Sequence, residues 1–582
     1  MEGFRDPYNR AAFPWDGGRM DCATVFRNAI AVRKALPVLT AGDFEPFADG
    51  EDVFGFWRRG EDGECVCVLA NASLHDAHTV RVPMAGEAVS DVVSGAAPAV
   101  VDGCAEAFLW PLGTAVLHFH KQRRLQEPLE PGMGVLCHVT SLPNEGGPGT
   151  LGAPARRFVD WLAECGQTYW QVLPVNPADG YGSPYAGLAA FAGNTCLLEK
   201  DPEDVLAELK DADDDPDYQS FLEKNKYWLT PYATFRAIKD LLGEGPWQEW
   251  PDAYARFSPG LARRVELADG VDRHRKLQYE FQREWDELRA YANARGIKIV
   301  GDMPMYVSGD SSDVWAERDI FELDERGYAQ VQAGCPGDGF DPEGQLWGNP
   351  TYRWDVLAAR GYDWWLARLE RAVKTYDYVR LDHFIGFSSY YKIAKGKPAR
   401  EGSFSFGPGL DLFRAAYQKL GPLPFIAEDL GVITPAVRAL IAETGIPGMD
   451  IVQFSDGDVR EGYEPKPDTV TFTGTHDNQT LLGFCQSRFG LEGQEATQMA
   501  DRIAASVLAS KNDVAIMPLQ DVLGLDDAAR MNVPGVAEGN WSWQAAWEDV
   551  VAATGRLAQM AQASGRFREA SAQALRGGTF AP

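Results

Sequence analysis

The feature that most constrains the fold is a long alternation of short apolar segments with amphipathic helical patterns, which begins near residue 134. Eight segments have the length and composition of buried strands: 134–140, 169–175, 298–306, 378–384, 424–429, 449–454, 469–475 and 513–519. Helical patterns fall between most of them, for example at 155–165, 364–375, 410–420, 435–443 and 495–509. Strands that alternate with helices form a parallel sheet, and eight such units make a TIM barrel. We therefore predict an α/β fold built on a (β/α)8 barrel.

Two further parts accompany the predicted barrel. About 120 residues between the second and third strands exceed a simple crossover, and their mostly helical pattern predicts an inserted subdomain at about 196–292. Before the barrel, short alternating strands at 53–58, 64–70, 78–82, 88–93, 107–110 and 114–120 predict a small all-β sandwich. We divide the chain into this sandwich with its leading helix (1–120), a Pro-punctuated linker (121–131) and the barrel (132–582).

The leading helix is predicted at 21–35, with an apolar stripe of Val25, Phe26, Ala29 and Ile30. That stripe must find a partner or remain exposed. Trp57 and Trp110 could bind a ligand from exposed positions of the sandwich, but we expect both to pack in its core.

The charge balance restricts the partners. The chain has 84 acidic and 55 basic residues, a net charge of −29 that opposes binding to nucleic acid or to an anionic membrane surface. We find no apolar span of about 18 residues, so no membrane partner is expected. Oligomeric state does not follow from these patterns.

The nine cysteines are scattered, and only Cys65 and Cys67 lie close together, on one face of a predicted strand. This pattern indicates small core residues in a reducing, cytoplasmic location. His118 and His120 share a strand face but have no nearby Cys or His partner, so we interpret them as an exposed pair rather than a metal site.

Acidic residues end three of the predicted barrel strands: Asp382 the fourth, Glu428 the fifth and Asp477 the seventh. The carboxyl ends of barrel strands meet at one rim, where catalytic residues converge. Glycoside chemistry needs an ionised carboxylate as nucleophile and a protonated carboxyl as acid, and a third carboxylate can hold sugar hydroxyls. Arg380 lies two residues before Asp382, so both point to the same side of the strand.

Two alternatives remain for these residues. Arg380 and Asp382 alone would suit a structural ion pair, and the three carboxylates would suit a divalent metal. Arg380 supplies a fixed positive charge where such a cation would sit, so we predict no metal, and no cofactor is implied.

The chain from about residue 134 to 543 resembles the amylomaltases, the 4-α-glucanotransferases or disproportionating enzymes. The matching motifs are GVLCHVTSLP (134–143), GQTYWQVLP (166–174), SPY (183–185), FAGN (191–194), GDMP (301–304), DSSDVW (310–315), GQLWGNP (344–350), RLDHF (380–384), IAEDLG (426–431), GTHDN (474–478) and GNW (539–541). In this order, across roughly 70% of the chain, they form a specific pattern. The first 120 residues resemble the C-terminal tail of an α-amylase-family enzyme, without that family's catalytic carboxylates, so we expect them to be non-catalytic.

The resemblance implies Asp382 as nucleophile, Glu428 as general acid/base and Asp477 as stabiliser of the transition state. It implies that the substrate-binding residues are Arg380, His383, His476, Ser183, Tyr185, Asp302, Trp347 and Asn349. Trp347, between Gly344 and Gly348, suits an exposed loop that stacks on the glucan. The implied activity is transfer of α-1,4-glucan segments between maltooligosaccharides, amylose or glycogen by a retaining double displacement. The alternatives are an α-1,4-glucan hydrolase and a non-catalytic glucan-binding fusion.

The chain departs from the family pattern at four places. Gly182 precedes Ser183 where an Asp is usual, and Ala186 follows Tyr185 where a Gln is common. The lid segment 334–343 is richer in Gly than usual, and Gln544 follows Trp543 in place of an Arg. None of these touches the three carboxylates, so they bear on acceptor preference and chain length.

Overall fold

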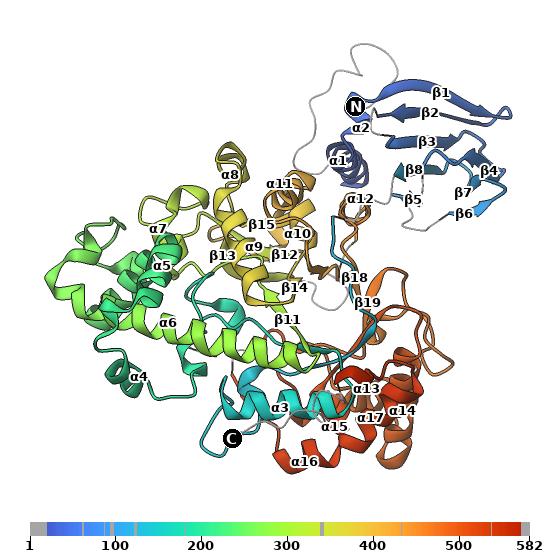
Figure 1. The fold of residues 1–582 in the computed structure, drawn as a ribbon. Helices are drawn as coiled ribbons and strands as arrows, with labels where there is room; N and C mark the ends of the chain where they lie inside the picture. The colour runs from blue at the N-terminus through green and yellow to red at the C-terminus, as the bar shows by residue number, and fades with distance from the viewer. Residues whose placement is uncertain are drawn as a thin grey trace.

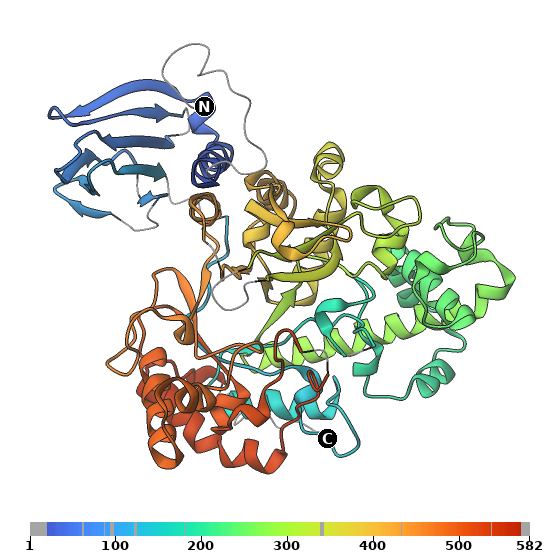
Figure 2. The same cartoon turned by 180° about the vertical axis from the view of Figure 1, so that it is seen from behind.

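The computed structural model describes residues 20–571 except 61–62, 87, 94–97, 121–124, 181, 338–342, 432 and 537. At its centre is an eight-stranded parallel sheet rolled into a barrel (Figure 1 and Figure 2). The strands are β9 (Gly132–Leu136), β10 (Tyr169–Gln171), β11 (Lys298–Met303), β14 (Tyr378–Leu381), β17 (Phe425–Ala427), β18 (Gly448–Ile451), β19 (Thr469–Phe472) and β20 (Val514–Pro518). The predicted barrel of eight strands is confirmed.

Strands that follow one another along the chain are neighbours in the barrel, from β17 through β14, β11, β10, β9, β20 and β19 to β18. At the seam between the two outermost strands, the Ala427 N–H donates to the Pro447 carbonyl at 2.8 Å. The barrel interior is filled by alternate apolar side chains, among them Leu136, Tyr169, Val300, Tyr378, Ile426, Met449, Val470 and Ile516. Helices cover the outside, so the strands are buried on both faces, as in other all-parallel sheets.

The helices that cover the barrel include all five that the sequence predicts: α3 (Ala153–Glu164), α9 (Asp363–Thr375), α11 (Leu410–Leu420), α12 (Pro435–Thr444) and α14 (Gly493–Leu508). Close packing needs a glycine in one strand. A β-carbon on Gly301 of β11 would lie 2.2 Å from the ring of Tyr376, which follows α9. Glycine therefore lets the end of this helix approach the strand that carries Asp302.

The inserted segment consists mainly of α4 (Pro202–Glu208) and two long helices, α5 (Pro216–Leu242) and α6 (Val265–Ala294), which lie side by side. Tyr279 of α6 packs against Tyr218 and Phe221 of α5, with ring centroids 5.2 and 5.4 Å apart. This agrees with the predicted mostly helical insertion.

An unpredicted four-stranded antiparallel sheet stands beside the barrel, in the order β13 (Gln345–Pro350), β12 (Val331–Cys335), β15 (Ser389–Ala394) and β16 (Ser403–Phe406). Trp347 lies on β13, so the prediction that it sits on a loop is wrong. The glycines around it suggested a loop, but antiparallel pairing with β12 holds the segment extended.

The N-terminal sandwich is confirmed. A five-stranded sheet contains, in spatial order, β1 (Asp43–Asp49), β2 (Val53–Arg59), β3 (Cys65–Asn71), β8 (Thr114–His120) and β5 (Ala88–Asp91). The other sheet contains β4 (His78–Pro83), β7 (Cys104–Leu109) and β6 (Ala99–Val101). Trp57, Cys65 and Cys67 lie in the shared core as predicted, whereas Trp110 is 69% exposed, so its predicted core packing is wrong.

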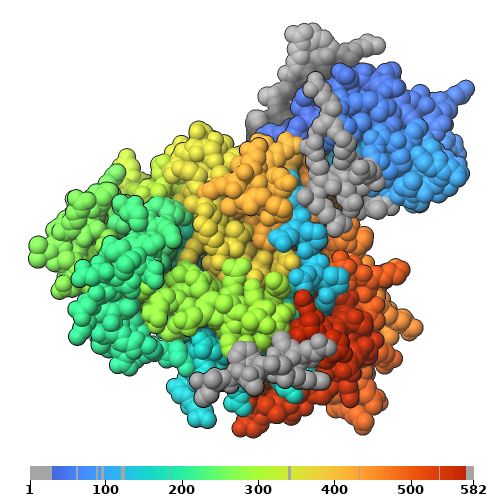
Figure 3. Space-filling model, in the orientation of Figure 1, coloured from blue at the N-terminus to red at the C-terminus, as the bar shows by residue number. Residues whose placement is uncertain are grey.

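The sandwich forms a lobe beside the yellow and orange part of the barrel (Figure 3). Its leading helix α1 (Met20–Ala35) packs on α12, where Ala31, Val32 and Ala35 share a cluster with Ala436 and Ala439. Small side chains on both helices allow this close approach. The predicted stripe is not the buried face, because Phe26 and Ile30 are 70% and 46% exposed; the side chain of Val25 lies outside the described residues.

His118 is fully buried, so its prediction as an exposed residue is wrong. Its Nε2 atom lies 2.9 Å from Glu64 of the sandwich and 2.9 Å from Glu443 of α12. The side chain of His120 lies outside the described residues. No described helix has a stretch long and apolar enough to cross a membrane.

Candidate active site

The register of the barrel strands brings the predicted residues to one rim. Asp302 of β11 pairs with Arg380 of β14, and Arg380 pairs with Ile426 of β17. Tyr378 and Arg380 alternate along β14, Asp382 follows directly after the strand, and Tyr378 belongs to the barrel core. The charged residues therefore continue the inward-facing series just above the apolar layers, where side chains of neighbouring strands meet.

Arg380 is the electrostatic centre of this rim. Its buried guanidinium donates from Nη1 to both carboxylate oxygens of Asp302, at 2.9 and 2.7 Å. The same nitrogen donates to Asp382 Oδ1 at 3.1 Å. Asp382 is thus held beside a permanent positive charge. Burial raises the pKa of Asp302, although Arg380 acts in the opposite direction.

The surroundings of Glu428 favour the protonated form of its carboxyl. Burial raises the pKa of its carboxyl to about 8, and the nearby Asp382 adds to the rise, while Arg380 and two backbone donors oppose it. These donors are the N–H of His383 to Oε2 at 2.7 Å and of Leu430 to Oε1 at 2.9 Å. His383 has a φ of +48°, a left-handed turn directly after Asp382 that is uncommon for a non-glycine residue. The turn and the two hydrogen bonds fix the carboxyl beside the predicted nucleophile.

Asp477 follows β19 and is held from two sides. His476 Nε2 lies 3.3 Å from its Oδ2, and the Asn532 amide donates to its Oδ1 at 2.6 Å. Burial acts to raise the pKa of Asp477, but His476, Asn532 and Arg380 outweigh it and hold the pKa well below the usual range. The side chain is still 45% exposed, so it can meet a ligand.

Aromatic rings line two sides of this rim. Tyr185 stacks on His476 with centroids 5.0 Å apart, and Trp541 lies 5.8 Å from Tyr185. The Tyr185 hydroxyl donates to Asp302 Oδ2 at 2.7 Å. Elsewhere Trp347, 37% exposed, meets the His383 ring edge-on at 5.0 Å. Flat, partly exposed rings next to carboxylates are the surfaces that a sugar ring can pack against.

Most of the predicted residues are therefore linked by direct contacts, and two are set apart. Ser183 lies on the turn before Tyr185, where its N–H donates to Asp179 at 2.9 Å. The Asn349 amide donates to the Val307 carbonyl at 3.0 Å, which fixes the backbone beyond β11. Asn532 and Trp541 also belong to the site, although they are not among the site residues predicted from the sequence. The GNW motif (539–541) signalled Trp541, whereas no pattern signalled the distant partner of Asp477.

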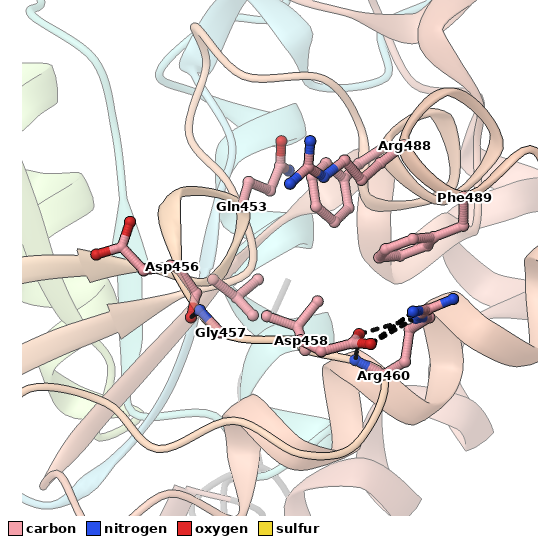
Figure 4. A pocket seen from close by; sticks show the side chains of 11 residues that line it. Gln453, Asp456, Gly457, Asp458, Arg460, Arg488 and Phe489 are labelled. Carbon is pink, nitrogen blue, oxygen red and sulfur yellow. Dashed lines mark hydrogen bonds and ion pairs between the residues drawn. The ribbon is translucent and has the colours of Figure 1, made fainter.

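A cavity of about 440 Å³ lies beyond the end of β18, between residues 452–460 and α13 (Leu481–Phe489) (Figure 4). Gln453, Asp458, Arg460, Arg488 and Phe489 contribute to its lining, but none of the three carboxylates does. Gln453 also donates to the Thr473 and Gln479 carbonyls, at 3.1 and 2.9 Å, so it braces the segment that carries Asp477.

Comparisons with known proteins show the family of this chain. The sequence profile of the family described as 4-alpha-glucanotransferase matches residues 137–213 and 202–548. The chain belongs to the 4-alpha-glucanotransferase family. The predicted activity is thereby confirmed, and the hydrolase and the non-catalytic fusion are not favoured.

Individual glucanotransferases support the assignment. The 4-alpha-glucanotransferase of Streptococcus pneumoniae is 40% identical over 467 residues, covering 71% of this chain and 92% of that protein. The Thermus thermophilus enzyme is 38% identical over 497 residues, covering 75% and 99%. The structure of an amylomaltase from Streptococcus agalactiae in complex with acarbose superposes with a TM-score of 0.68 at 34% identity, covering 75% of this chain and all of that one. An amylomaltase from Corynebacterium glutamicum shares the fold, with a TM-score of 0.59 at 17% identity and 88% and 89% coverage.

The departures from the glucanotransferase pattern have structural counterparts. Gly182 has a φ of +81° and faces Trp541, so a side chain there would be strained in its backbone. Gln544 donates to the Leu142 and Gly147 carbonyls at 2.8 and 2.7 Å and pins the loop after β9. Half of the lid segment 334–343 lies outside the described residues.

Proposed function

We propose that this glucanotransferase works by a retaining double displacement, with Asp382 as nucleophile, Glu428 as acid and base, and Asp477 as the carboxylate that stabilises the transition state. The observation that carries the proposal is the opposite setting of two neighbouring carboxyls. Asp382 has a guanidinium 3.1 Å away, whereas burial raises the pKa of Glu428 to about 8. Near neutral pH Glu428 therefore holds a proton, as the acid of the reaction must, while Asp382 lies against a cation.

In the first half-reaction, an Asp382 oxygen attacks the anomeric carbon of the sugar. The bond from that carbon to the glycosidic oxygen breaks, and its electron pair stays on the oxygen, which takes the proton of Glu428. The shortened glucan leaves with a free 4-hydroxyl, and a glycosyl ester on Asp382 remains. The two carboxyl groups should be about 5–5.5 Å apart for this chemistry.

In the second half-reaction, Glu428 is a carboxylate and removes the proton from the 4-hydroxyl of an acceptor sugar. The acceptor oxygen attacks the anomeric carbon, and the ester bond to Asp382 breaks with its electrons returning to the carboxylate. Transfer dominates over hydrolysis if the acceptor sugar is positioned better than water. The rings of Tyr185, Trp541 and Trp347 are the surfaces suited to that positioning.

The substrates that we propose are α-1,4-glucans, namely maltooligosaccharides, amylose and glycogen. The solved amylomaltase with acarbose supports a site for oligosaccharides of this type. The binding roles of Arg380, His383, His476, Ser183, Tyr185, Asp302, Trp347 and Asn349 are part of the same proposal. The cytoplasmic location and the domain boundaries near residues 120 and 132 also stay predictions.

The roles of the two central carboxyls can be separated with two substrates. α-Maltosyl fluoride needs no proton on its leaving group, so Glu428→Gln should still release a burst of about one fluoride per active site, after which the glycosyl ester lacks a base for its transfer. Its maltotriose transfer should fall by at least about a hundred-fold. Asp382→Asn should lose both reactions. Fluoride is measured with an electrode, and the maltotriose products by chromatography as a ladder of longer sugars plus glucose. Fluoride release by Asp382→Asn at the wild-type rate would remove the nucleophile assignment.

A further inference from the structure

The N-terminal sandwich carries an exposed aromatic pair at the end of one of its strands. Phe108 and Trp110, at the end of β7, are 55% and 69% exposed. Their rings meet edge to face, with centroids 5.0 Å apart and an interplanar angle of 88°. Figure 1 and Figure 2 both show β4, β6 and β7 on the side of the sandwich that faces away from the barrel. The neighbouring Leu74 and Leu112 are 67% and 63% exposed, and we call these four residues the Trp110 platform.

The backbone beneath the Trp110 platform is rigidly connected. Asn71, only 3% exposed, donates from its amide to the carbonyls of Asp76 at 2.8 Å, Leu109 at 3.4 Å and Trp110 at 3.0 Å. The Leu112 N–H donates to the Ser73 carbonyl at 3.1 Å. The two segments that present the exposed side chains are thus tied by one buried amide and a backbone bond. A ligand would find the rings already oriented, so little ordering cost opposes binding.

The composition of the platform favours a neutral carbohydrate. One face of a pyranose ring is lined by C–H bonds that pack on an indole, while its hydroxyls need polar neighbours. The half-buried Ser73 and the exposed His75 and Asp76, on the segment that Asn71 holds, supply such neighbours. The net charge of −29 opposes a polyanion. A second copy of the chain would need roughly 20–30 contact residues on each side, far more than the platform offers.

We propose that the Trp110 platform is a non-catalytic binding site for an α-1,4-glucan chain. The proposal rests on the proposed function only in the choice of polymer, since the catalytic site acts on the same chains. A long glucan held at the platform stays near the active site, which raises its effective concentration there. A trisaccharide is too short to gain from this tether. The platform therefore affects polymers and not maltotriose.

The test compares full-length variants by native electrophoresis in gels that contain glycogen. Trp110→Ala should weaken the retardation by glycogen about five-fold or more, while Trp110→Phe, which keeps an aromatic face, should retain most of it. Phe44→Ala is the matched control, because Phe44 is 61% exposed but lies on β1, in the other sheet. The rate of transfer from maltotriose should be the same in all four proteins.

Retardation of Trp110→Ala equal to that of the wild type would overturn the proposal, and so would an equal loss in Phe44→Ala. A wild-type dimer that becomes a monomer in Trp110→Ala, seen by light scattering, would assign the platform to a second copy instead. Failure of the proposed function has a different signature. If the wild type makes no longer sugars from maltotriose but Trp110→Ala still loses retardation, the platform stands without it.

Discussion

The protein contains two clusters in which acidic residues surround one cationic residue, and the two clusters serve different purposes. At the barrel rim, Arg380 lies between Asp302 and Asp382, and Glu428 is nearby. At the junction of sandwich and barrel, His118 lies between Glu64 and Glu443. The cation of the rim keeps its charge at all relevant pH values, whereas that of the junction can lose its proton.

The difference between the two clusters shows which carboxyl groups remain able to react. At the junction, both carboxylates lie 2.9 Å from one buried imidazole, and the three ligand-type atoms fall within 4.8 Å of one another. At the rim, the arginine is shared, Asp382 is 26% exposed, and Glu428 is bonded to backbone N–H groups rather than to a cation. Incomplete pairing leaves the rim able to react, and close pairing makes the junction a structural contact.

The largest effect should come from removing the fixed cation of the rim. Arg380→Leu leaves the fully buried Asp302 without its cationic partner, which should lower the free energy of unfolding by about 3–5 kcal/mol. Transfer should fall at least about a hundred-fold, because Asp382 loses its positive neighbour. Denaturant unfolding and maltotriose transfer measure the two effects.

The double variant Arg380→Leu with Asp302→Asn separates the two causes. It should recover much of the stability, since no buried carboxylate remains unpaired, but not the activity. Full transfer by either variant would show that Arg380 does not support Asp382.

The second prediction concerns the pH dependence of the rim. Glu428 must hold a proton to act as acid, and burial raises its pKa to about 8. The kcat/KM for maltotriose should therefore fall above about pH 8, approaching ten-fold per pH unit. The rate of the fluoride burst from α-maltosyl fluoride in Glu428→Gln should lack this alkaline limb. A limb that persists in that variant would assign the titration to another group.

The barrel could be predicted more completely from the sequence than the other parts of the chain, because its strands and helices follow a clear periodic pattern. All eight strands were predictable because strands such as Val514–Pro518 are continuous apolar runs between helical patterns. The strand Asp43–Asp49 was missed because it is mostly exposed and contains Pro46 and several acids. The four-stranded sheet was missed because its pairing joins segments up to about 60 residues apart, which no local pattern reveals.

The same limit separates the predictable from the unpredictable site residues. Asp382, Glu428 and Asp477 follow strands, so topology alone brings them together. The Asn532 amide reaches Asp477 from a loop 55 residues away, and nothing near Asn532 indicates that contact. His118 looked exposed in its own strand because its partner Glu443 lies on a barrel helix.

The junction should respond to pH through His118. Burial acts to lower the pKa of His118, but Glu443 and Glu64 outweigh it and raise the pKa to about 9 from 6.5. A raised histidine pKa stabilises the folded state fully below pH 6.5, and this contribution is lost as the pH rises through 9. His118→Gln should cost about 3 kcal/mol at pH 6, and progressively less towards pH 9.5, without changing transfer.

Melting curves of the wild type and the variant across this pH range measure the effect. His78→Gln is the control, since His78 lies at the surface of the same lobe, 3.5 Å from Asp52. Burial raises the pKa of Glu443 to about 7, so Glu64 alone of the two acids defines the lower edge of the window. His118 and Glu443 hold the pKa of Glu64 at about 2 against the effect of its burial, so its contribution disappears only in strong acid. A pH-independent difference between variant and wild type would contradict the charged role of His118.

The smallest effects test which face of α1 joins the sandwich to the barrel. Val32 is 7% exposed in the cluster with Ala436 and Ala439, so Val32→Ala should cost about 1–2 kcal/mol through the cavity it leaves. Phe26 is 70% exposed, and Phe26→Ala should change stability by no more than about 0.5 kcal/mol although it removes more atoms. The same melting curves at pH 6 compare the two. An equal loss in Phe26→Ala would mean that the stripe read from the sequence is buried after all, and that the junction extends around α1 rather than along one face.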